Sequence, residues 1–441
     1  MTWQLQDGTQ ISLWSGYDWF SRFLHPHLQH LVECIGRGEV KSGRDLAARV
    51  PGTPLAQAFL DGDESANWPL ALPSSLALPA SVYPLHFVFH RAGESFGLAI
   101  ETPQDLRALH DALSGEWRSS GSATARAMAR GLAERGVLGP DTSHRHDLDR
   151  PGIHRLQHAA LMFRTPSACL VTDYVLDAHF DNIAPPSALP ANTAIAITHS
   201  HGDHFSLPSL LQLPRATPII VPKVERHSML CLRMEALLEE AGFEAVVALS
   251  PGDTFAWHDI RIAAYPFYGE QPWLDFASPV SDLRNWGLTY VIEANGVKSW
   301  VLADSGQEFG HAMAELCSTV NERHGRLDHV FSNLREFRWH PGQIDSSGRY
   351  LFCFDREQLF DADAWPGGTS MTLGPAGVAR VLEGLDAAEF RPYAHWWHEP
   401  GGSSVKVDGT WQEHKMVARI GQFTRSCSTR LQNWSVGDCL A

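Results

Sequence analysis

Alternating hydrophobic and polar positions predict that the chain begins with β-structure. Residues 1–14 alternate around Asp7-Gly8, a pair that is common in hairpin turns. A helical spacing of apolar residues follows over residues 17–36, which predicts a helix. Two later runs, 85–89 and 96–100, read as further strands.

Two amphipathic helices are predicted next. Thr102 and Pro103 are typical of a helix cap and first helical position. A second helix is expected from Ser122 to Arg135, ending at Gly136. Strands followed by two helices have a winged-helix-like order, so we expect a small α+β domain over residues 1–150. Its expected role is dimerisation or the docking of a substrate or partner.

The polar stretch 140–152 breaks this periodicity, and we place a domain boundary there. Beyond it, short apolar runs interleave with amphipathic segments, which indicates a layered α/β domain over residues 151–441. Strands are expected at 158–163, 168–175, 194–198, 218–222, 259–265, 288–294, 298–303, 327–331 and 390–394, with helices at 229–240, 308–320 and 375–386.

Composition narrows the class of protein. The 441 residues carry a formal net charge of −15 without a cluster of Lys and Arg, so we expect no nucleic-acid partner. No apolar run has the length of a membrane span, and the N-terminus lacks the pattern of a signal peptide. The seven cysteines are scattered and form no CxxC pair. We therefore expect a cytoplasmic protein with reduced thiols and no membrane partner.

The main chemical signal is a histidine-rich loop. His199, His201, Asp203 and His204 follow the apolar run 194–197. Alternate residues of an extended segment point the same way, so His199 and His201 can share one metal ion. Asp203 and His204 lie past a glycine that permits a tight turn, and they can serve a second ion.

Three other metal-competent side chains follow predicted strands. Glu270 comes after a strand that ends near Pro266, Asp304 leaves the strand 298–303, and His395 leaves the strand 390–394. Each signal is weak alone, because acidic residues often follow strands. With the loop at 199–204 they make a set of seven candidate ligands.

The motif His199-Ser200-His201-Gly202-Asp203-His204 resembles the HxHxDH motif of the metallo-β-lactamase superfamily. The segments 152–159 and 171–176 resemble strands that precede this motif in the family. The resemblance implies an αββα sandwich with a dimetal site at one edge of its two sheets. By motif position, Asp304 matches the bridging carboxylate and His395 the last histidine, for which His398 is a competing candidate.

One position departs from the zinc hydrolases of the superfamily. They place a histidine after the strand that ends near Pro266, where this chain offers Glu270; the nearest histidine, His258, precedes the strand. A carboxylate-rich set of nitrogen and oxygen donors suits iron. The sequence is therefore similar to the diiron branch of the superfamily, which includes the chloramphenicol-pathway β-hydroxylase.

That resemblance implies an O2-dependent diiron oxygenase, or monooxygenase, of natural-product biosynthesis. One iron would be held by His199, His201 and Glu270, the other by Asp203, His204 and His395, and Asp304 would bridge them. Asp203 and Glu270 are the expected catalytic residues. The substrate class is amino-acid-derived, free or linked to a carrier or peptide, with O2 as co-substrate and an external electron donor.

The alternative is a dizinc hydrolase of the lactonase or phosphodiesterase type. In it the same cluster binds two zinc ions, and Asp203 orients a hydroxide between them. The sequence does not choose between these chemistries except through Glu270. A homodimer formed through the N-terminal domain is a further expectation.

Overall fold

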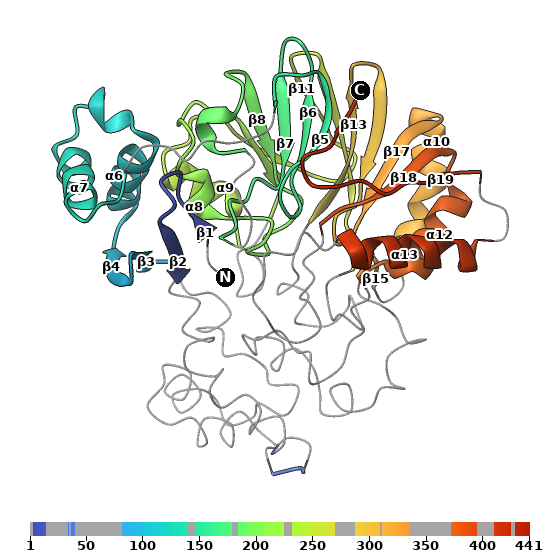
Figure 1. The fold of residues 1–441 in the computed structure, drawn as a ribbon, viewed down its shortest axis with the longest axis horizontal. Coiled ribbons are helices and arrows are strands. Elements are labelled where there is room, and N and C mark those ends of the chain that lie inside the picture. Colours follow the sequence, from blue (N-terminus) through green and yellow to red (C-terminus); the bar gives the residue numbers. More distant parts are fainter. Residues whose placement is uncertain are drawn as a thin grey trace.

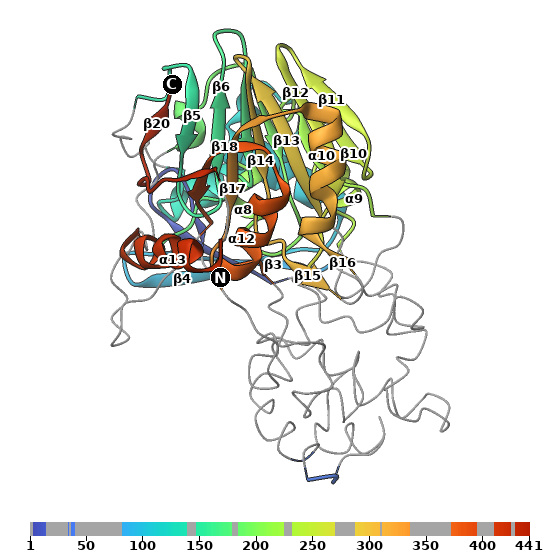
Figure 2. The ribbon, with the colours of Figure 1, turned by 90° about the vertical axis from the view of Figure 1, so that its right-hand side faces the viewer.

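Two β-sheets packed face to face form the centre of the protein (Figure 1). The computed structural model describes residues 3–14, 34, 37–39, 82–138, 147–178, 184–224, 232–269, 287–308, 311–335, 372–394, 410–424 and 428–441. The predicted helix over residues 17–36 lies almost wholly outside these ranges. Figure 2 looks onto the outer layer of helices that covers one of the sheets, formed by α10 (Cys317–His324), α12 (Gly374–Gly384) and α13 (Thr410–Phe423).

The first sheet has seven strands in the order β10-β9-β8-β7-β6-β5-β20. Its central neighbours β7, β8, β9 and β10 are parallel, and β7, β8 and β9 are buried along their whole length. Continuous apolar strands are expected where a parallel sheet is covered on both faces. The strands are β5 (Gly152–Arg155), β6 (Leu161–Arg164), β7 (Cys169–Thr172), β8 (Thr193–Ala196), β9 (Ile219–Pro222), β10 (Val246–Leu249) and β20 (Cys439–Leu440).

The second sheet also has seven strands, in the order β11-β12-β13-β14-β17-β18-β19. It is antiparallel from β11 to β14 and parallel from β14 to β19. Its strands are β11 (Thr254–Trp257), β12 (Ile260–Pro266), β13 (Leu288–Ala294), β14 (Val297–Val301), β17 (Leu327–Ser332), β18 (Ala387–Pro392) and β19 (Arg430–Leu431).

Among the described residues, three apolar cores hold these layers together. One lies between the sheets and contains Phe163 and Ile292. Another packs the outer face of the second sheet against α10 (Cys317–His324), α12 (Gly374–Gly384) and α13 (Thr410–Phe423). The remaining core covers the first sheet with α8 (Leu207–Leu210) and α9 (Met234–Glu240). The layers are therefore helix, sheet, sheet, helix, which confirms the predicted αββα sandwich.

The N-terminal elements form a four-stranded antiparallel sheet and two helices. Its strands are β1 (Trp3–Gln4), β2 (Gln10–Trp14), β3 (Leu85–Arg91) and β4 (Glu94–Ile100), followed by α6 (Pro103–Ser114), the 3-10 turn η3 (Glu116–Arg118) and α7 (Ala123–Glu134). The Thr102 side chain caps α6 by accepting from the amide of Asp105, as predicted.

These N-terminal elements share one apolar core with the first sheet and its helices. Leu106 and Leu109 of α6 belong to the same cluster as Met234 and Leu238 of α9. The boundary near residue 150 thus remains a prediction, and a continuous core joins the described elements on its two sides. Within the described residues, no helix is long and apolar enough to span a membrane.

One predicted helix begins later than expected. The segment 308–320 starts with a small hairpin, β15 (Gln307–Glu308) and β16 (His311–Ala312), and continues as η6 (Met313–Leu316) before α10. Strands β10, β11 and β20, helix α13 and the 3-10 turn η4 (Pro186–Ala188) were not predicted. The short strands are stabilised by pairing with neighbours distant in sequence, a contribution that local patterning does not reveal.

Candidate metal centre

The histidine-rich loop leaves the first sheet directly after strand β8. Thr198, at the end of this strand, donates from its amide and its hydroxyl to the two carboxylate oxygens of Asp173, each at 2.7 Å. Asp173 itself follows the neighbouring parallel strand β7. The ends of adjacent parallel strands meet at one edge of a sheet, which places these polar groups together.

His204 lies between two carboxylates. Its Nδ1 is 2.8 Å from Asp173 Oδ2 and its Nε2 is 3.1 Å from Asp304 Oδ2. Burial opposes charging of the ring, but the carboxylates of Asp173, Asp304 and Asp203 outweigh it and hold the pKa of His204 well above its ordinary value. Asp173 fixes the ring orientation, and to act as a metal ligand His204 must release the proton on Nε2.

His199 has the opposite electrostatic environment. Its ring is buried, 4.1 Å from the ring of His204 and 4.7 Å from that of His201 between centroids. Burial, followed by the neighbouring charge of His204 and His201, holds the pKa of His199 well below its ordinary value. A neutral imidazole is the form that binds a metal ion. The Phe267 ring lies 4.9 Å away and covers one side of His199.

Asp304 reaches the same cluster from the second sheet. It follows β14, and its Oδ1 accepts a hydrogen bond from the side-chain amide of Asn333, which follows β17. Oxygen or nitrogen atoms of His199, His204 and Asp304 all lie within 4.8 Å of one another. Because these residues come from both sheets, the cluster exists only when the sandwich is assembled.

His158 is a buried residue beside the site, and it was not among the ligands predicted from the sequence. Its Nε2 is 3.2 Å from Asp203 Oδ2, and its ring stands 5.6 Å from that of His204 between centroids. His158, Asp203 and His204 form a second group whose donor atoms all lie within 4.8 Å. The available signal was its place in the turn between β5 and β6, in a segment already similar to the superfamily.

The histidines around Asp203 favour the ionised form of its carboxyl group. Burial would raise the pKa of this carboxyl, but His204, the hydrogen bond from His158 and the charges of His158 and His201 hold it well below its ordinary value. The carboxylate thus remains available as an oxygen donor on the partly open side of the cluster.

Four non-glycine residues at or beside this centre have unusual backbone conformations. His158, Asp173, Ala303 and Ala394 have φ angles of 48°, 46°, 49° and 61°, in the left-handed region that non-glycine residues rarely adopt. Ala394 and His158 are also joined, because the amide of Ala394 donates to the carbonyl of His158 at 3.2 Å. Such conformations cost about 1–3 kcal/mol each and occur where surrounding structure enforces them, often at functional sites.

Gly287 allows the second sheet to approach the histidine loop. Its backbone pairs with His199 in an isolated bridge. A Cβ at this position would lie 2.9 Å from Phe267 Cγ and 3.0 Å from His199 Cβ. Any larger side chain would therefore push on the His199 ring or on the aromatic ring beside it.

The structure brings together five of the seven predicted ligands: His199, His201, Asp203, His204 and Asp304. Glu270 and His395, with the competing His398, lie outside the described residues. His258 is in the turn between β11 and β12, with its ring 4.5 Å from that of Trp257. The imidazole and carboxylate donors of the described cluster fit a two-ion site of iron or zinc.

Comparison with known proteins agrees with this geometry. A family model described as a β-lactamase superfamily domain matches residues 171–392, half of the chain. No curated protein matches the sequence. Several solved structures are similar to this chain.

The structure of CmlA, a diiron β-hydroxylase from Streptomyces venezuelae, is similar over 98% of both chains, at 17% identity and a TM-score of 0.60. A mutant of CmlA β-hydroxylase gives 15% identity and 0.61 over the same coverage. An isothiocyanate hydrolase from Delia radicum gut bacteria covers 66% of this chain and 98% of its own, at 14% identity and 0.43.

Proposed function

The chain belongs to the metallo-β-lactamase superfamily, and from that premise we propose that it is an O2-dependent diiron oxygenase. The proposed reaction is hydroxylation, or a related oxidation, of an amino-acid-derived substrate in natural-product biosynthesis. That substrate is free or linked to a carrier or peptide. An external donor supplies the electrons.

The observation that carries this proposal is the extent of the structural likeness. The diiron β-hydroxylase shares the fold over 98% of both chains, including the elements that precede the superfamily domain. Glu270 supports the diiron proposal from the sequence. It provides a hard oxygen donor where the zinc hydrolases of the superfamily have a histidine.

The described residues have distinct parts in this proposal. Two iron ions, when bound, would supply O2 activation and the oxidation of the substrate. His199, His201, Asp203, His204 and Asp304 would hold them, with Glu270 and His395 completing the set. Asp173 orients His204 through Nδ1, Asn333 orients Asp304 through Oδ1, and His158 orients Asp203 through Oδ2. Phe267 keeps water from one face of His199.

A dizinc hydrolase of the lactonase or phosphodiesterase type is the second candidate. The described imidazoles and carboxylates suit zinc as well as iron, and none of them is specific to oxygen chemistry. In this alternative the same residues, Asp203 and Asp304 among them, would hold two zinc ions, which would supply activation of water for the hydrolysis of an ester or phosphodiester.

Metal content and O2 uptake separate the two functions. The protein is produced in cells given iron and zinc together, and its metals are counted by mass spectrometry. Two irons per chain, with O2 consumed after chemical reduction, are expected for the oxygenase. Two zincs per chain without O2 consumption would overturn it.

A Glu270→His substitution tests the residue on which the choice of metal depends. It restores the histidine of the zinc hydrolases, so the ratio of iron to zinc should fall at least severalfold when both metals are supplied. Glu270→Ala is the companion variant, and it should lower the iron content. An unchanged ratio in both variants would show that Glu270 does not select the metal.

A further inference from the structure

We propose that a pocket between the N-terminal hairpin and helices α6 and α7 binds a small phosphate monoester with an apolar arm. The pocket has a volume of about 560 Å³. Ligand pockets for small molecules commonly have volumes of roughly 300–1,000 Å³. The inference does not depend on which metal occupies the metal centre or on the reaction carried out there.

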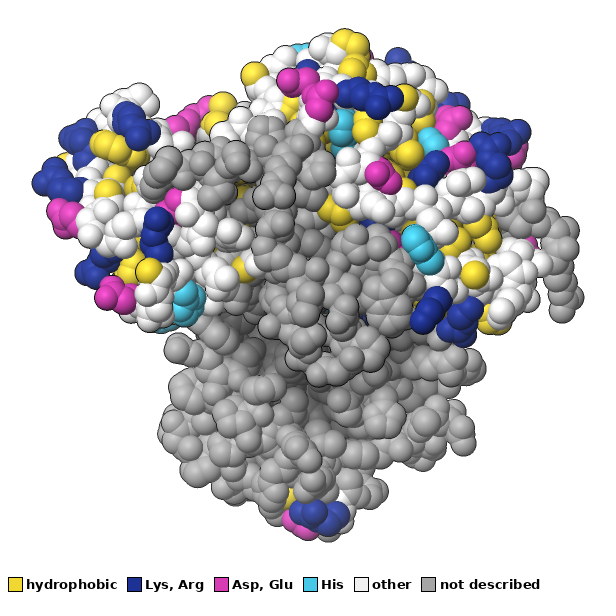
Figure 3. Space-filling model, viewed as in Figure 1, with side chains coloured by type: hydrophobic (Ala, Val, Ile, Leu, Met, Phe, Trp, Pro, Cys, Tyr) yellow, Lys and Arg dark blue, Asp and Glu magenta, His cyan; other side chains and the backbone are white. Residues whose placement is uncertain are grey.

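Three guanidinium groups give this pocket its charge. Arg126 and Arg130 lie one turn apart on the same face of α7, and Arg118 lines the pocket from η3. Within the described part of the chain, none of the three forms an ion pair with a carboxylate. Unpaired cations gathered in one pocket contrast with the net charge of −15 of the whole protein. Figure 3 shows Lys and Arg side chains, in dark blue, gathered over the α6–α7 region on the left.

Two of these groups are held in place by neighbouring atoms. The Arg126 guanidinium donates to the carbonyls of Ser120 and Gly121 at 2.9 and 3.3 Å. The Arg118 guanidinium lies 4.8 Å from the centre of the Trp117 ring. Fixed guanidiniums bind oxyanions at a lower entropic cost than freely rotating ones, and several of them favour a phosphate dianion over a carboxylate.

The acidic residues in or near the pocket interact with groups other than its three arginines. Asp7 is the one acidic residue in the pocket lining, and its carboxylate forms an ion pair with Arg91. The Oε2 atom of Glu116 accepts a hydrogen bond from the backbone nitrogen of Arg215, at 3.2 Å. Neither carboxylate therefore neutralises the three arginines of the pocket.

Besides the polar residues Gln6, Ser114 and Gln212, the lining has an apolar surface that defines the arm of the ligand. It comprises Leu5, Ala112, Leu113, Trp117, Ala129 and Leu138. An aryl or short acyl group fits this surface, because it removes apolar area from water while the phosphate stays at the arginines.

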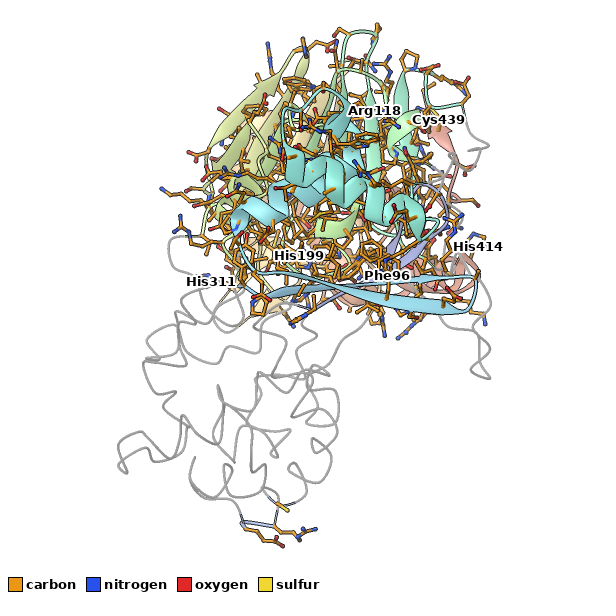
Figure 4. The ribbon with its side chains drawn as sticks, turned by 90° about the vertical axis from the view of Figure 1, so that its left-hand side faces the viewer. Phe96, Arg118, His199, His311, His414 and Cys439 are labelled. Carbon is orange, nitrogen blue, oxygen red and sulfur yellow. The ribbon has the colours of Figure 1, made fainter. Side chains whose placement is uncertain are left out.

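The hairpin that lines the pocket also contacts the metal loop through a hydrogen bond. Leu5, Gln6 and Asp7 form its rim, and Trp3 of the same hairpin donates from its indole nitrogen to the carbonyl of Gly202 at 3.3 Å. Asp7 comes four positions after Trp3, a reach of at most about 14 Å. Figure 4 labels Arg118 on the helical region that faces the viewer and His199 nearer the strand ends. The same hairpin therefore contributes to the pocket lining and contacts the loop that carries the metal ligands.

Calorimetric titration of the metal-loaded full chain with phenyl phosphate tests the proposal. We expect saturable binding that weakens about tenfold in an Arg126→Gln, Arg130→Gln double variant. Arg135→Gln is the matched control on the same helix, because its guanidinium lies over Phe96 outside the pocket lining. That variant should bind like the unchanged protein.

Three simpler ligands test separately the contributions of the apolar arm, the second charge and the anionic group. Inorganic phosphate, benzoate and phenol should each bind more weakly than phenyl phosphate. Inorganic phosphate lacks the apolar arm, benzoate lacks the second negative charge, and phenol lacks the anionic group. Equal binding of benzoate or of inorganic phosphate would overturn the assigned ligand class. Binding that survives the double substitution and disappears on chelation belongs to the metal centre and would overturn the pocket assignment. Absence of binding at millimolar phenyl phosphate would overturn it as well.

Discussion

The metal centre and the arginine pocket use charged residues in opposite ways. In the metal centre, His204, Asp173 and Asp304 are buried and hydrogen-bonded to one another, and they come from two sheets. In the pocket, Arg118, Arg126 and Arg130 are exposed, and they come from one short stretch of chain. The difference predicts that a substitution in the centre disturbs many partners, whereas one in the pocket changes a single charge.

The comparison also explains where strain is located. Four left-handed non-glycine residues lie around the metal centre, whereas the pocket lining contains one, Leu138 with a φ of 72°. A strained backbone persists only where packing enforces it, and the buried edge of the sandwich provides that packing. We therefore expect the centre to be rigid before a metal binds, and the pocket to depend on long side chains at its surface.

Removing Asp173 should have the largest effect. Asp173→Ala leaves the amide and hydroxyl of Thr198 and the Nδ1 of His204 without their acceptor in a buried site. We expect a loss of about 3–5 kcal/mol in the free energy of unfolding, with loss of bound metal. Chemical denaturation and metal counting measure both. Asp253→Ala in an exposed turn is the control, and an equal cost in the two variants would contradict the comparison.

Enlarging Gly287 should disturb the centre from the second sheet. In Gly287→Ala the new methyl meets Phe267 and His199 at 2.9–3.0 Å, so we expect a destabilisation of about 1–3 kcal/mol and lower metal occupancy. Gly421→Ala is the control, because a Cβ there meets no other atom within 4 Å in helix α13. That variant should be neutral or slightly stabilising. Normal metal occupancy in Gly287→Ala would show that the contact is not tight.

Replacing His158 tests whether it positions Asp203. His158→Asn keeps a residue that tolerates a left-handed backbone but removes the imidazole. We expect the metal affinity to fall about 10–100-fold, as for other partners of metal ligands, measured by competition with a chelator. His154→Asn on strand β5 serves as the buried-histidine control. If both variants bind metal as the unchanged protein does, His158 has only a packing role.

His110 should make the attachment of α6 sensitive to pH. Its buried ring nitrogens lie 2.9 Å from the carbonyl of Ala241 and 2.8 Å from that of Leu213, and burial lowers its pKa. The unfolded chain, with a histidine pKa near 6.5, therefore takes up a proton before the folded chain does. Stability should fall as the pH drops below about 6.5, by at most about 1.4 kcal/mol per pH unit from this group.

His110→Gln isolates that contribution. The free energy of unfolding is measured for both proteins between pH 7.5 and 5, and the difference between them should shrink as the pH falls. A constant difference across this range would show that His110 takes up its proton equally in both states.

The smallest effect is expected in the pocket. Arg130 is exposed and pairs with no carboxylate among the described residues, so Arg130→Gln should change the free energy of unfolding by less than about 0.5 kcal/mol. Thermal denaturation provides the measurement. A loss above 1 kcal/mol would mean that this arginine supports the fold, and the contrast with the metal centre would then fail.

Local sequence patterns predicted the elements that carry their own signals. The turn at Gly8, the cap at Thr102 and the buried strand around residue 195 all occur as expected. The histidine motif also predicted its own cluster, because His199 to His204 lie within one loop whose geometry is set by a few neighbouring residues. Periodicity, caps and turns are local properties, so they can be read from a single sequence.

The roles of Asp173 and His158, the clash at Gly287 and the pocket depend on tertiary structure. Asp173 and His204 are 31 residues apart and His158 and Asp203 are 45 apart, yet each pair is in hydrogen-bonding distance. The sequence by itself determined the superfamily resemblance and most of the candidate metal ligands. Only the packing of two sheets and an N-terminal unit decided which other side chains meet them, because those contacts join strand ends that no local pattern connects.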